Sequence, residues 1–172
     1  MQVGRSIVMY QQELDKIMKL DDSKLLAAVG PQADCSTFTE YIQKNMKLYE
    51  LNNDLRLSTP AAANYIRGEL AYALRQGPYQ TNLLLAGVDG GTASLFWMDY
   101  LGALHKVSYA AHGYASNFTL GLLDREYRED ITEADAVASI RRCIAELHKR
   151  FLISLPKFVI KVISADGIKI IE

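Results

Sequence analysis

The residues best able to do chemistry, the histidines and cysteines, are scattered along the chain. His105, His112 and His148 lie too far apart in sequence to suggest a metal or catalytic site. Cys35 and Cys143 form no CxxC pair, so we interpret them as buried free thiols in a reducing compartment. The sequence also lacks a glycine-rich phosphate loop, an HExxH zinc motif and a GxSxG nucleophile elbow. Motif chemistry alone therefore assigns no cofactor and no metal.

Composition excludes several classes of protein. The chain has 172 residues, 49% apolar and 23% charged, and its 19 basic and 20 acidic side chains leave a net charge of −1. The apolar fraction excludes intrinsic disorder, and the balanced charge argues against a nucleic-acid binder that works through bulk charge. No apolar run approaches the ~18 residues of a membrane helix, and the first residues lack the apolar core of a secretion signal. The sequence predicts a soluble, intracellular protein with a single domain, residues 1–172.

Apolar runs and turn residues predict blocks of strands that alternate with pairs of helices. The predicted strands are Ser6–Tyr10, Lys16–Leu20, Leu25–Val29, Asn82–Gly87, Ser94–Met98, Leu104–Tyr109, Phe158–Ile163 and Ile168–Ile170. The predicted helices are Gln32–Glu50, a second from Thr59 to a stop at Gly77-Pro78, a third over Ala115–Tyr127 and a fourth over Thr132–Phe151. Asp89-Gly90-Gly91 and Asp166-Gly167 are typical of hairpin turns, which imply antiparallel sheets.

The predicted helices carry apolar residues at helical spacing, which indicates the faces that pack on a sheet. Thr59 is predicted to cap the second helix, with Pro60 at its first position. Thr132 is predicted to cap the fourth helix, with Asp135 completing a capping box, and Arg141-Arg142 is interpreted as its solvated face. The predicted apolar faces are Phe38, Tyr41, Ile42, Met46 and Tyr49 in the first helix, Ala62, Tyr65, Ile66, Leu70, Ala73 and Leu74 in the second, and Val137, Ile140, Ile144, Leu147 and Phe151 in the fourth.

The order of these elements predicts the fold class. A doubly wound parallel sheet needs alternating single strands and helices, which paired helices between strand blocks do not provide. Continuous apolar strands between amphipathic helices instead indicate two antiparallel sheets stacked face to face, with a helix pair outside each. The predicted fold is therefore α+β, a four-layer αββα sandwich.

Six segments of the sequence match a known family. They are Phe38–Asn53, Thr59–Arg75, Asn82–Asp89, Met98–Lys106, Ala110–Tyr127 and Ala145–Ile163. Together they resemble the β subunits of the proteasome, which have the N-terminal-nucleophile hydrolase fold. The resemblance covers nearly the whole chain from Ser6 onward, and it implies the same αββα architecture.

The resemblance also implies which residues occupy the family's active-site positions. Catalytic members use an N-terminal threonine as nucleophile, supported by a lysine and an aspartate. Lys16 takes the place of that lysine, Gly30 that of the glycine whose N–H forms the oxyanion hole, and Ser154 that of a supporting residue. Tyr114 and Phe151 depart from the family pattern, because they replace a serine and an aspartate.

The start of the chain departs most from the family. By the resemblance, Met1 lies close to where an active-site aspartate would stand, so we expect the family's opening strand pair and its nucleophile to be absent. No residue is then expected to be catalytic, and Lys16, Gly30 and Ser154 are expected to be vestigial framework positions.

The resemblance thus implies a non-catalytic structural subunit of the 20S proteasome core. Such a subunit occupies a fixed place in the heptameric β ring and helps form the proteolytic chamber for ubiquitin-dependent protein degradation, in the cytoplasm and nucleus. The expected partners are other α and β subunits in a 28-subunit complex of stacked rings, with no nucleic acid, membrane, cofactor or metal. Ten tyrosines, more than a core needs, also indicate assembly. The alternative is an active threonine-type N-terminal-nucleophile peptidase subunit.

Overall fold

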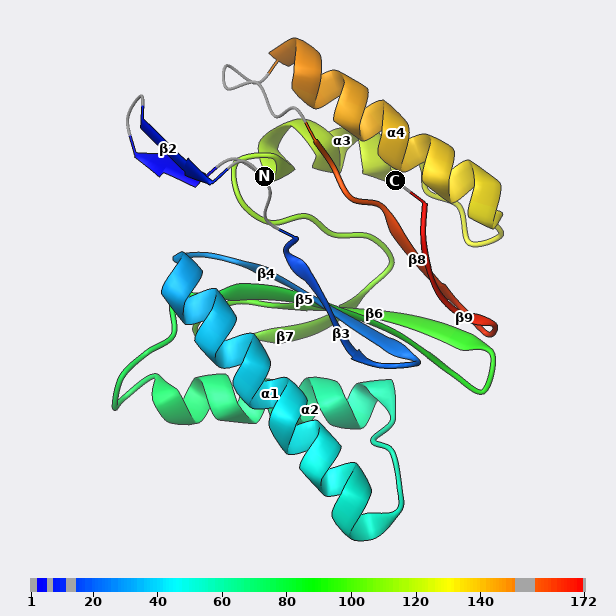
Figure 1. Cartoon of the computed structure of the whole chain (residues 1–172). Coiled ribbons are helices and arrows are strands. Elements are labelled where there is room, and N and C mark those ends of the chain that lie inside the picture. The colour runs from blue at the N-terminus through cyan, green and yellow to red at the C-terminus, as the bar shows by residue number, and fades with distance from the viewer. Residues whose placement is uncertain (1–2, 6–7, 12–14, 151–156, 172) are drawn as a thin grey trace. The chain divides into compact units, whose positions relative to one another are not determined.

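A computed structural model of the chain describes residues 3–5, 8–11, 15–150 and 157–171 (Figure 1). The chain divides into two compact units. The sheet unit comprises residues 16–108 and 162–169, and the helix-pair unit comprises residues 1–15, 109–161 and 170–172. The organisation of the chain as a single domain stays a prediction.

The sheet unit contains a five-stranded antiparallel sheet. In their order across the sheet, the strands are β3 (Ile17–Asp21), β4 (Lys24–Val29), β5 (Asn82–Asp89), β6 (Thr92–Met98) and β7 (Leu104–Val107). Gly90 and Gly91 connect β5 to β6 with φ angles of 56° and 83°, which glycine adopts without steric cost. The predicted strands in this region and the hairpin after Asp89 are therefore confirmed.

Two helices, α1 (Gln32–Asn53) and α2 (Thr59–Ala73), cover one face of this sheet (Figure 1). The core between them consists largely of fully buried aliphatic and aromatic side chains, among them Phe38, Ile42, Ile66, Leu70, Leu83, Leu85 and Met98. On β5, Leu83 and Leu85 point into this core, whereas Leu84 between them is only half-buried. The apolar run of β5 therefore has one fully buried face and one partly buried face.

The start of α2 differs from the prediction by one residue. Ser58, not Thr59, is the N-cap: its backbone is extended, and its hydroxyl accepts a hydrogen bond from the backbone N–H of Ala61 at 3.4 Å. Thr59 is the first helical residue, and its backbone N–H donates to the Asp89 carboxylate at 2.8 Å. Pro60 is consequently the second helical residue. Because Asp89 satisfies the Thr59 N–H, the helix can begin one residue earlier than a Thr59 cap would allow.

Helix α1 is longer than predicted, and two of its predicted core residues are exposed. It continues to Asn53 and ends at Asp54, whose φ of 49° is a left-handed conformation that short polar side chains tolerate. Tyr41 and Tyr49 are 41% and 38% exposed, so they lie beside the buried line of Phe38, Ile42 and Met46 rather than within it. The Tyr41 hydroxyl donates instead to Glu69 of α2, at 3.0 Å.

The helix-pair unit contains a two-stranded antiparallel sheet and two helices that pack on each other. Its elements are β1 (Val3–Arg5), β2 (Val8–Gln11), α3 (Ser116–Glu126) and α4 (Glu133–Arg150). The predicted cap at Thr132 is confirmed, because the Asp135 backbone N–H donates to the Thr132 hydroxyl at 3.2 Å. The Asp135 side chain also contacts the cap, but its carboxylate accepts from the Thr132 hydroxyl, at 2.9 Å, a bond different from the one to the backbone N–H that defines a capping box.

The buried face of α4 is rotated relative to the prediction. The buried residues are Ser139, Cys143 and Leu147, whereas Ile140 is 39% exposed. Of the predicted face only Leu147 is buried, and Phe151 lies outside the described residues. Ser139 lies next to the contact with α3, because its hydroxyl accepts a hydrogen bond from Arg142, which pairs with Glu126 of α3. A ranking by hydrophobicity does not register such a polar contact.

A closing hairpin pairs β8 (Lys161–Ser164) with β9 (Gly167–Ile170) through the predicted turn at Asp166 and Gly167. Strand β8 begins three residues later than the predicted start at Phe158. The described elements, helices together with antiparallel sheets, confirm an α+β fold. No helix in the described part of the chain has the length and apolarity that a membrane span requires.

Candidate functional site

Lys16 lies at one end of the sheet, directly before β3. Its backbone oxygen accepts a hydrogen bond from the Ala28 N–H at 3.0 Å, so the β3–β4 ladder continues to this residue. Since strand residues alternate between faces, Lys16 shares a face with Met18, which packs against the core. The Lys16 side chain is half-buried, and this desolvation lowers the pKa of its ammonium group, although interaction with Cys35 partly offsets the lowering.

Gly30 follows β4 at the same end of the sheet, and only glycine fits there. A Cβ atom at this position would lie 2.1 Å from the backbone oxygen of Gln80 and 3.2 Å from the Cα of Thr81. The same segment is held from the other side by Asp34, whose carboxylate accepts a hydrogen bond from the Gln80 N–H at 2.9 Å. The loop that leads into α1 is thus fixed against the loop that leads into β5.

Cys35 lies in the first turn of α1, at a site for which its sequence context gave no indication. Its sulfur lies 3.4 Å from the hydroxyl of Thr81, which is fully buried. Both cysteines are free; Cys143 is buried as predicted, but Cys35 is only half-buried, so the prediction is wrong for Cys35. Its partner is 46 residues away in sequence, and no local pattern could have indicated the pairing.

The structure brings together only part of the predicted site. Lys16 and Gly30 lie at the same end of β3 and β4, since these two strands are antiparallel. Tyr114 belongs to the helix-pair unit. Its side chain is 79% exposed, so no pocket of that unit surrounds it. Phe151 and Ser154 lie outside the described residues. Among the residues that the structure describes, none provides a carboxylate that forms an ion pair with Lys16.

In the helix-pair unit, the main polar contact is an ion pair between α3 and α4. The guanidinium group of Arg142 donates to both carboxylate oxygens of Glu126, at 2.8 to 3.0 Å, and to the Ser139 hydroxyl at 3.0 Å. Hydrogen bonding to Arg142 lowers the pKa of Glu126 to about 2. Arg142 is 53% exposed and so lies on the solvated face, as predicted, and its charged group additionally joins the two helices.

A comparison with known proteins decides the family. Residues 1–163 match the family model described as "Proteasome subunit". The chain belongs to the proteasome subunit family. It is 49% identical to proteasome subunit beta type-2 of Dictyostelium discoideum, with 98% of this chain and 87% of that protein covered. It is 48% identical to subunit beta type-2-B of Arabidopsis thaliana (94% and 82% covered) and 35% identical to subunit beta type-4 of Saccharomyces cerevisiae (99% and 87% covered).

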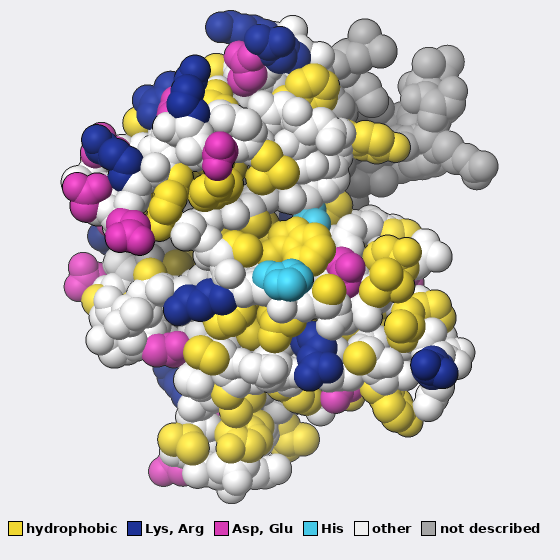
Figure 2. Space-filling model, turned by 180° about the vertical axis from the view of Figure 1, so that it is seen from behind, with side chains coloured by type: hydrophobic (Ala, Val, Ile, Leu, Met, Phe, Trp, Pro, Cys, Tyr) yellow, Lys and Arg dark blue, Asp and Glu magenta, His cyan; other side chains and the backbone are white. Residues whose placement is uncertain are grey.

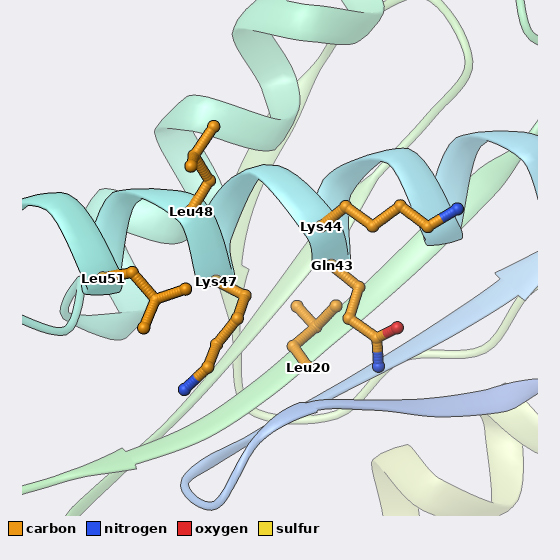
Figure 3. Close-up of a pocket in the computed structure, with 6 residues that line it drawn as sticks. All are labelled: Leu20, Gln43, Lys44, Lys47, Leu48 and Leu51. Carbon is orange, nitrogen blue, oxygen red and sulfur yellow. The ribbon is translucent and has the colours of Figure 1, made fainter.

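This proteasome subunit has an open groove of about 460 Å³ beside α1 (Figure 3). Apolar and basic side chains line it: Leu20, Gln43, Lys44, Lys47, Leu48 and Leu51. Lys44 and Lys47 are already paired within the helix, with Glu40 at 3.4 Å and Glu50 at 2.9 Å. The groove therefore presents leucine side chains between neutralised charges, which does not fit a small anionic ligand.

The surface of the subunit carries charges of both signs. On the face shown in Figure 2, lysine and arginine side chains alternate with acidic ones and with groups of hydrophobic side chains. The His105 ring stacks at a tilt on Trp97, with centroids 6.0 Å apart, and His148 meets Phe158 edge-on at 5.4 Å. Within the described residues, no group of three or more His, Cys, Asp or Glu side chains could hold a metal ion.

Proposed function

We propose that this proteasome subunit is a non-catalytic structural member of the 20S core. In this proposal it has the four-layer αββα architecture, occupies a fixed place in a seven-membered β ring and helps enclose the proteolytic chamber for ubiquitin-dependent degradation. Its partners are the other α and β subunits of a 28-subunit stack, and it is located in the cytoplasm and nucleus.

The observation that carries the non-catalytic assignment is the surroundings of Lys16. Two framework positions are retained, since Lys16 and Gly30 lie at one end of the sheet. The groups around them differ from those expected of a catalytic subunit. Among the described residues, the neighbour of Lys16 is the Cys35 thiol rather than a carboxylate. Tyr114, at the position of the family's serine, has an exposed side chain. Phe151, at the aspartate position, supplies no carboxylate. A base or nucleophile cannot be oriented without such partners.

Assembly is supported by large apolar side chains on the surface of the sheet unit. Leu48, Leu51 and Leu55, on and just after the last turns of α1, are 53%, 70% and 60% exposed. A further group of exposed residues consists of Tyr72, Tyr100 and Leu101. Contiguous exposed apolar side chains are characteristic of surfaces that bind other proteins. Tyrosine is also enriched at such interfaces, as the number of tyrosines in the sequence indicates.

The test compares two lysines of the same strand region in the assembled particle. Proteasomes would be purified from cells that express tagged wild-type chain, Lys16→Ala or Lys19→Ala, and assayed with fluorogenic peptides for each peptidase specificity. Lys19 is the matched control because its side chain is 56% exposed and its ammonium forms a surface ion pair with Asp22, at 2.7 Å. The proposal expects co-purification in a large particle and equal activities for all three. Loss of one specificity in Lys16→Ala alone would favour the alternative.

The alternative, an active threonine-type peptidase subunit, is favoured by one observation. A half-buried lysine with a lowered pKa, at the same end of the sheet as Gly30, is the combination expected of catalytic members. A threonine-directed covalent inhibitor distinguishes the two functions. The non-catalytic assignment expects no mass increase on this chain when the particle is treated with the inhibitor, and a stoichiometric adduct on this chain would overturn it.

A further inference from the structure

Lys16 and Cys35 place an amine and a thiol at the same corner of the sheet unit. Lys16 precedes β3, and its backbone pairs with Ala28 of β4, two residues before Gly30. From Gly30 the chain turns directly into α1, where the Cys35 N–H donates to the Pro31 oxygen at 3.0 Å in the first helical turn. The first turn of α1 therefore lies at the end of the sheet where Lys16 precedes β3.

The side chains of both residues are on the helix-covered face of the sheet. Lys16 shares this face with Met18, and both Met18 and Cys35 pack against the same core. The two groups also interact electrostatically, since Cys35 partly offsets the lowering of the Lys16 pKa that burial causes. The Thr81 hydroxyl, 3.4 Å from the sulfur and fully buried, fixes the thiol on one side.

Both groups are accessible and chemically competent. Lys16 and Cys35 are half-buried rather than sealed, and no described carboxylate neutralises the amine. Desolvation favours the neutral, nucleophilic form of the Lys16 amine at a given pH. Cys143 provides the contrast within the same chain: it is buried, and desolvation raises the pKa of its thiol, which lowers its reactivity.

We propose that Lys16 and Cys35 form an amine–thiol site that is modified covalently by α,β-unsaturated aldehydes. The Cys35 sulfur adds to the β-carbon, a C–S bond forms, and the thiol proton ends on the α-carbon. The Lys16 amine then condenses with the aldehyde carbon, a C=N bond forms, and one water molecule leaves. Neither step needs an oxidant or a metal.

The pairing makes the second step fast and the product specific. Once the thioether has formed, the aldehyde is tethered beside the Lys16 amine, so the condensation is intramolecular and its effective concentration is high. A lone lysine can form an imine or add to the β-carbon, and a lone cysteine can form a thioether, but neither alone gives a bridge between an amine and a thiol. The bridge between residues 16 and 35 is therefore the signature of the site.

Ortho-phthalaldehyde tests the geometry, because it forms a fluorescent isoindole, with loss of two water molecules, only where an amine and a thiol lie together. The purified, folded chain would be treated without added thiol. We expect fluorescence from the wild type and from Cys143→Ser, and its loss in Cys35→Ser and in Lys16→Arg. Cys35→Ser can keep the hydrogen bond to Thr81, and circular dichroism would verify that each variant is folded. Fluorescence that persists in Lys16→Arg, or that disappears in Cys143→Ser, would overturn the proposal.

Acrolein tests the chemistry itself. The chain, alone and within purified particles, would be treated with acrolein, reduced with borohydride and digested for mass spectrometry. We expect a crosslinked pair of peptides that contain Lys16 and Cys35, and no crosslink in either single variant. Modification of Cys35 without a bridge, or bridges that use Lys19 or Lys24 equally, would contradict an amine–thiol site.

Discussion

The two units of the molecule hold their helices by different means. In the sheet unit, α1 and α2 pack through fully buried apolar side chains such as Phe38, Ile66 and Leu85. In the helix-pair unit, the buried line of α4 includes the small residues Ser139 and Cys143, and an ion pair between Arg142 and Glu126 joins the helices. Apolar burial dominates the packing in the sheet unit. In the helix-pair unit, small buried side chains and the ion pair contribute more.

This difference explains where a hydrophobic pattern succeeds as a predictor. Where apolar burial is the main driving force, most aliphatic residues that repeat at helical spacing are also the buried ones, as Ile42 and Met46 are in α1 and Ile66 and Leu70 are in α2. Where polar groups and small side chains determine the contact, the most hydrophobic residues need not face the partner. Ile140 of α4 illustrates this, since it is 39% exposed although it belongs to the most hydrophobic stripe of its helix.

The largest effect is expected from Phe38→Ala in α1. Phe38 is fully buried in the core, and its removal deletes an aromatic ring and leaves a cavity, which should lower the free energy of unfolding by about 3 to 5 kcal/mol. Urea denaturation followed by circular dichroism would measure it. Leu55→Ala is the control, because this side chain is 60% exposed and should change stability by no more than about 0.5 kcal/mol. Similar losses in both variants would show that apolar burial does not dominate this unit.

The second prediction tests the rotated face of α4. Leu147 is 7% exposed, so Leu147→Ala should cost about 2 to 5 kcal/mol of unfolding free energy. Ile140→Ala removes a side chain that is already 39% exposed and should cost less than about 1 kcal/mol. Denaturant melts of the two variants provide the comparison. If Ile140→Ala were the more damaging, the face predicted from hydrophobicity would be correct.

The third prediction concerns the junction that positions the candidate site. At Gly30 a methyl group would overlap the Gln80 backbone, so Gly30→Ala should destabilise the chain by roughly 1 to 3 kcal/mol. At Gly68, inside α2, an added Cβ meets nothing within 4 Å, so Gly68→Ala should stabilise by about 0.5 to 1 kcal/mol. Thermal melts of the pair should therefore shift in opposite directions. A Gly30→Ala variant as stable as wild type would remove the case for a tight junction.

The sequence was sufficient for features that depend on local chemistry. Apolar runs located β4, β5 and β6, and Asp89-Gly90-Gly91 located their hairpin, because glycine is the residue that tolerates the backbone angles found there. The cap of α2 could not be chosen in the same way: Ser58 and Thr59 both carry hydroxyl groups. The choice depends on Asp89, 30 residues away, which binds the Thr59 N–H.

The residues of the candidate site also differ in whether the sequence alone could identify them. The family resemblance located Lys16 and Gly30, and the structure places both at one end of the sheet. Cys35 was missed because its relation to Lys16 and Thr81 arises from tertiary structure. Such contacts join segments that are distant in sequence, and no periodicity or local motif encodes them.

The smallest effect is expected from the ion pair of the helix-pair unit, and it should depend on pH. The folded-state pKa of Glu126 is about 2, lowered from 4.5 by hydrogen bonds from Arg142. A carboxyl group with a depressed folded-state pKa stabilises the fold above its unfolded-state pKa, and this contribution is lost as the pH falls through the folded-state value. The stability difference between wild type and Glu126→Gln should therefore be constant above about pH 5.5 and shrink steadily between about pH 4.5 and 2. Melting temperatures measured across this range in low salt would show this pH dependence, and added salt should reduce the difference because the pair is partly exposed.

Glu129→Gln is a suitable control for this prediction, since Glu129 is an exposed residue just after α3. A difference for Glu126→Gln that is independent of pH would mean that the charge of Glu126 does not contribute to the contact between α3 and α4.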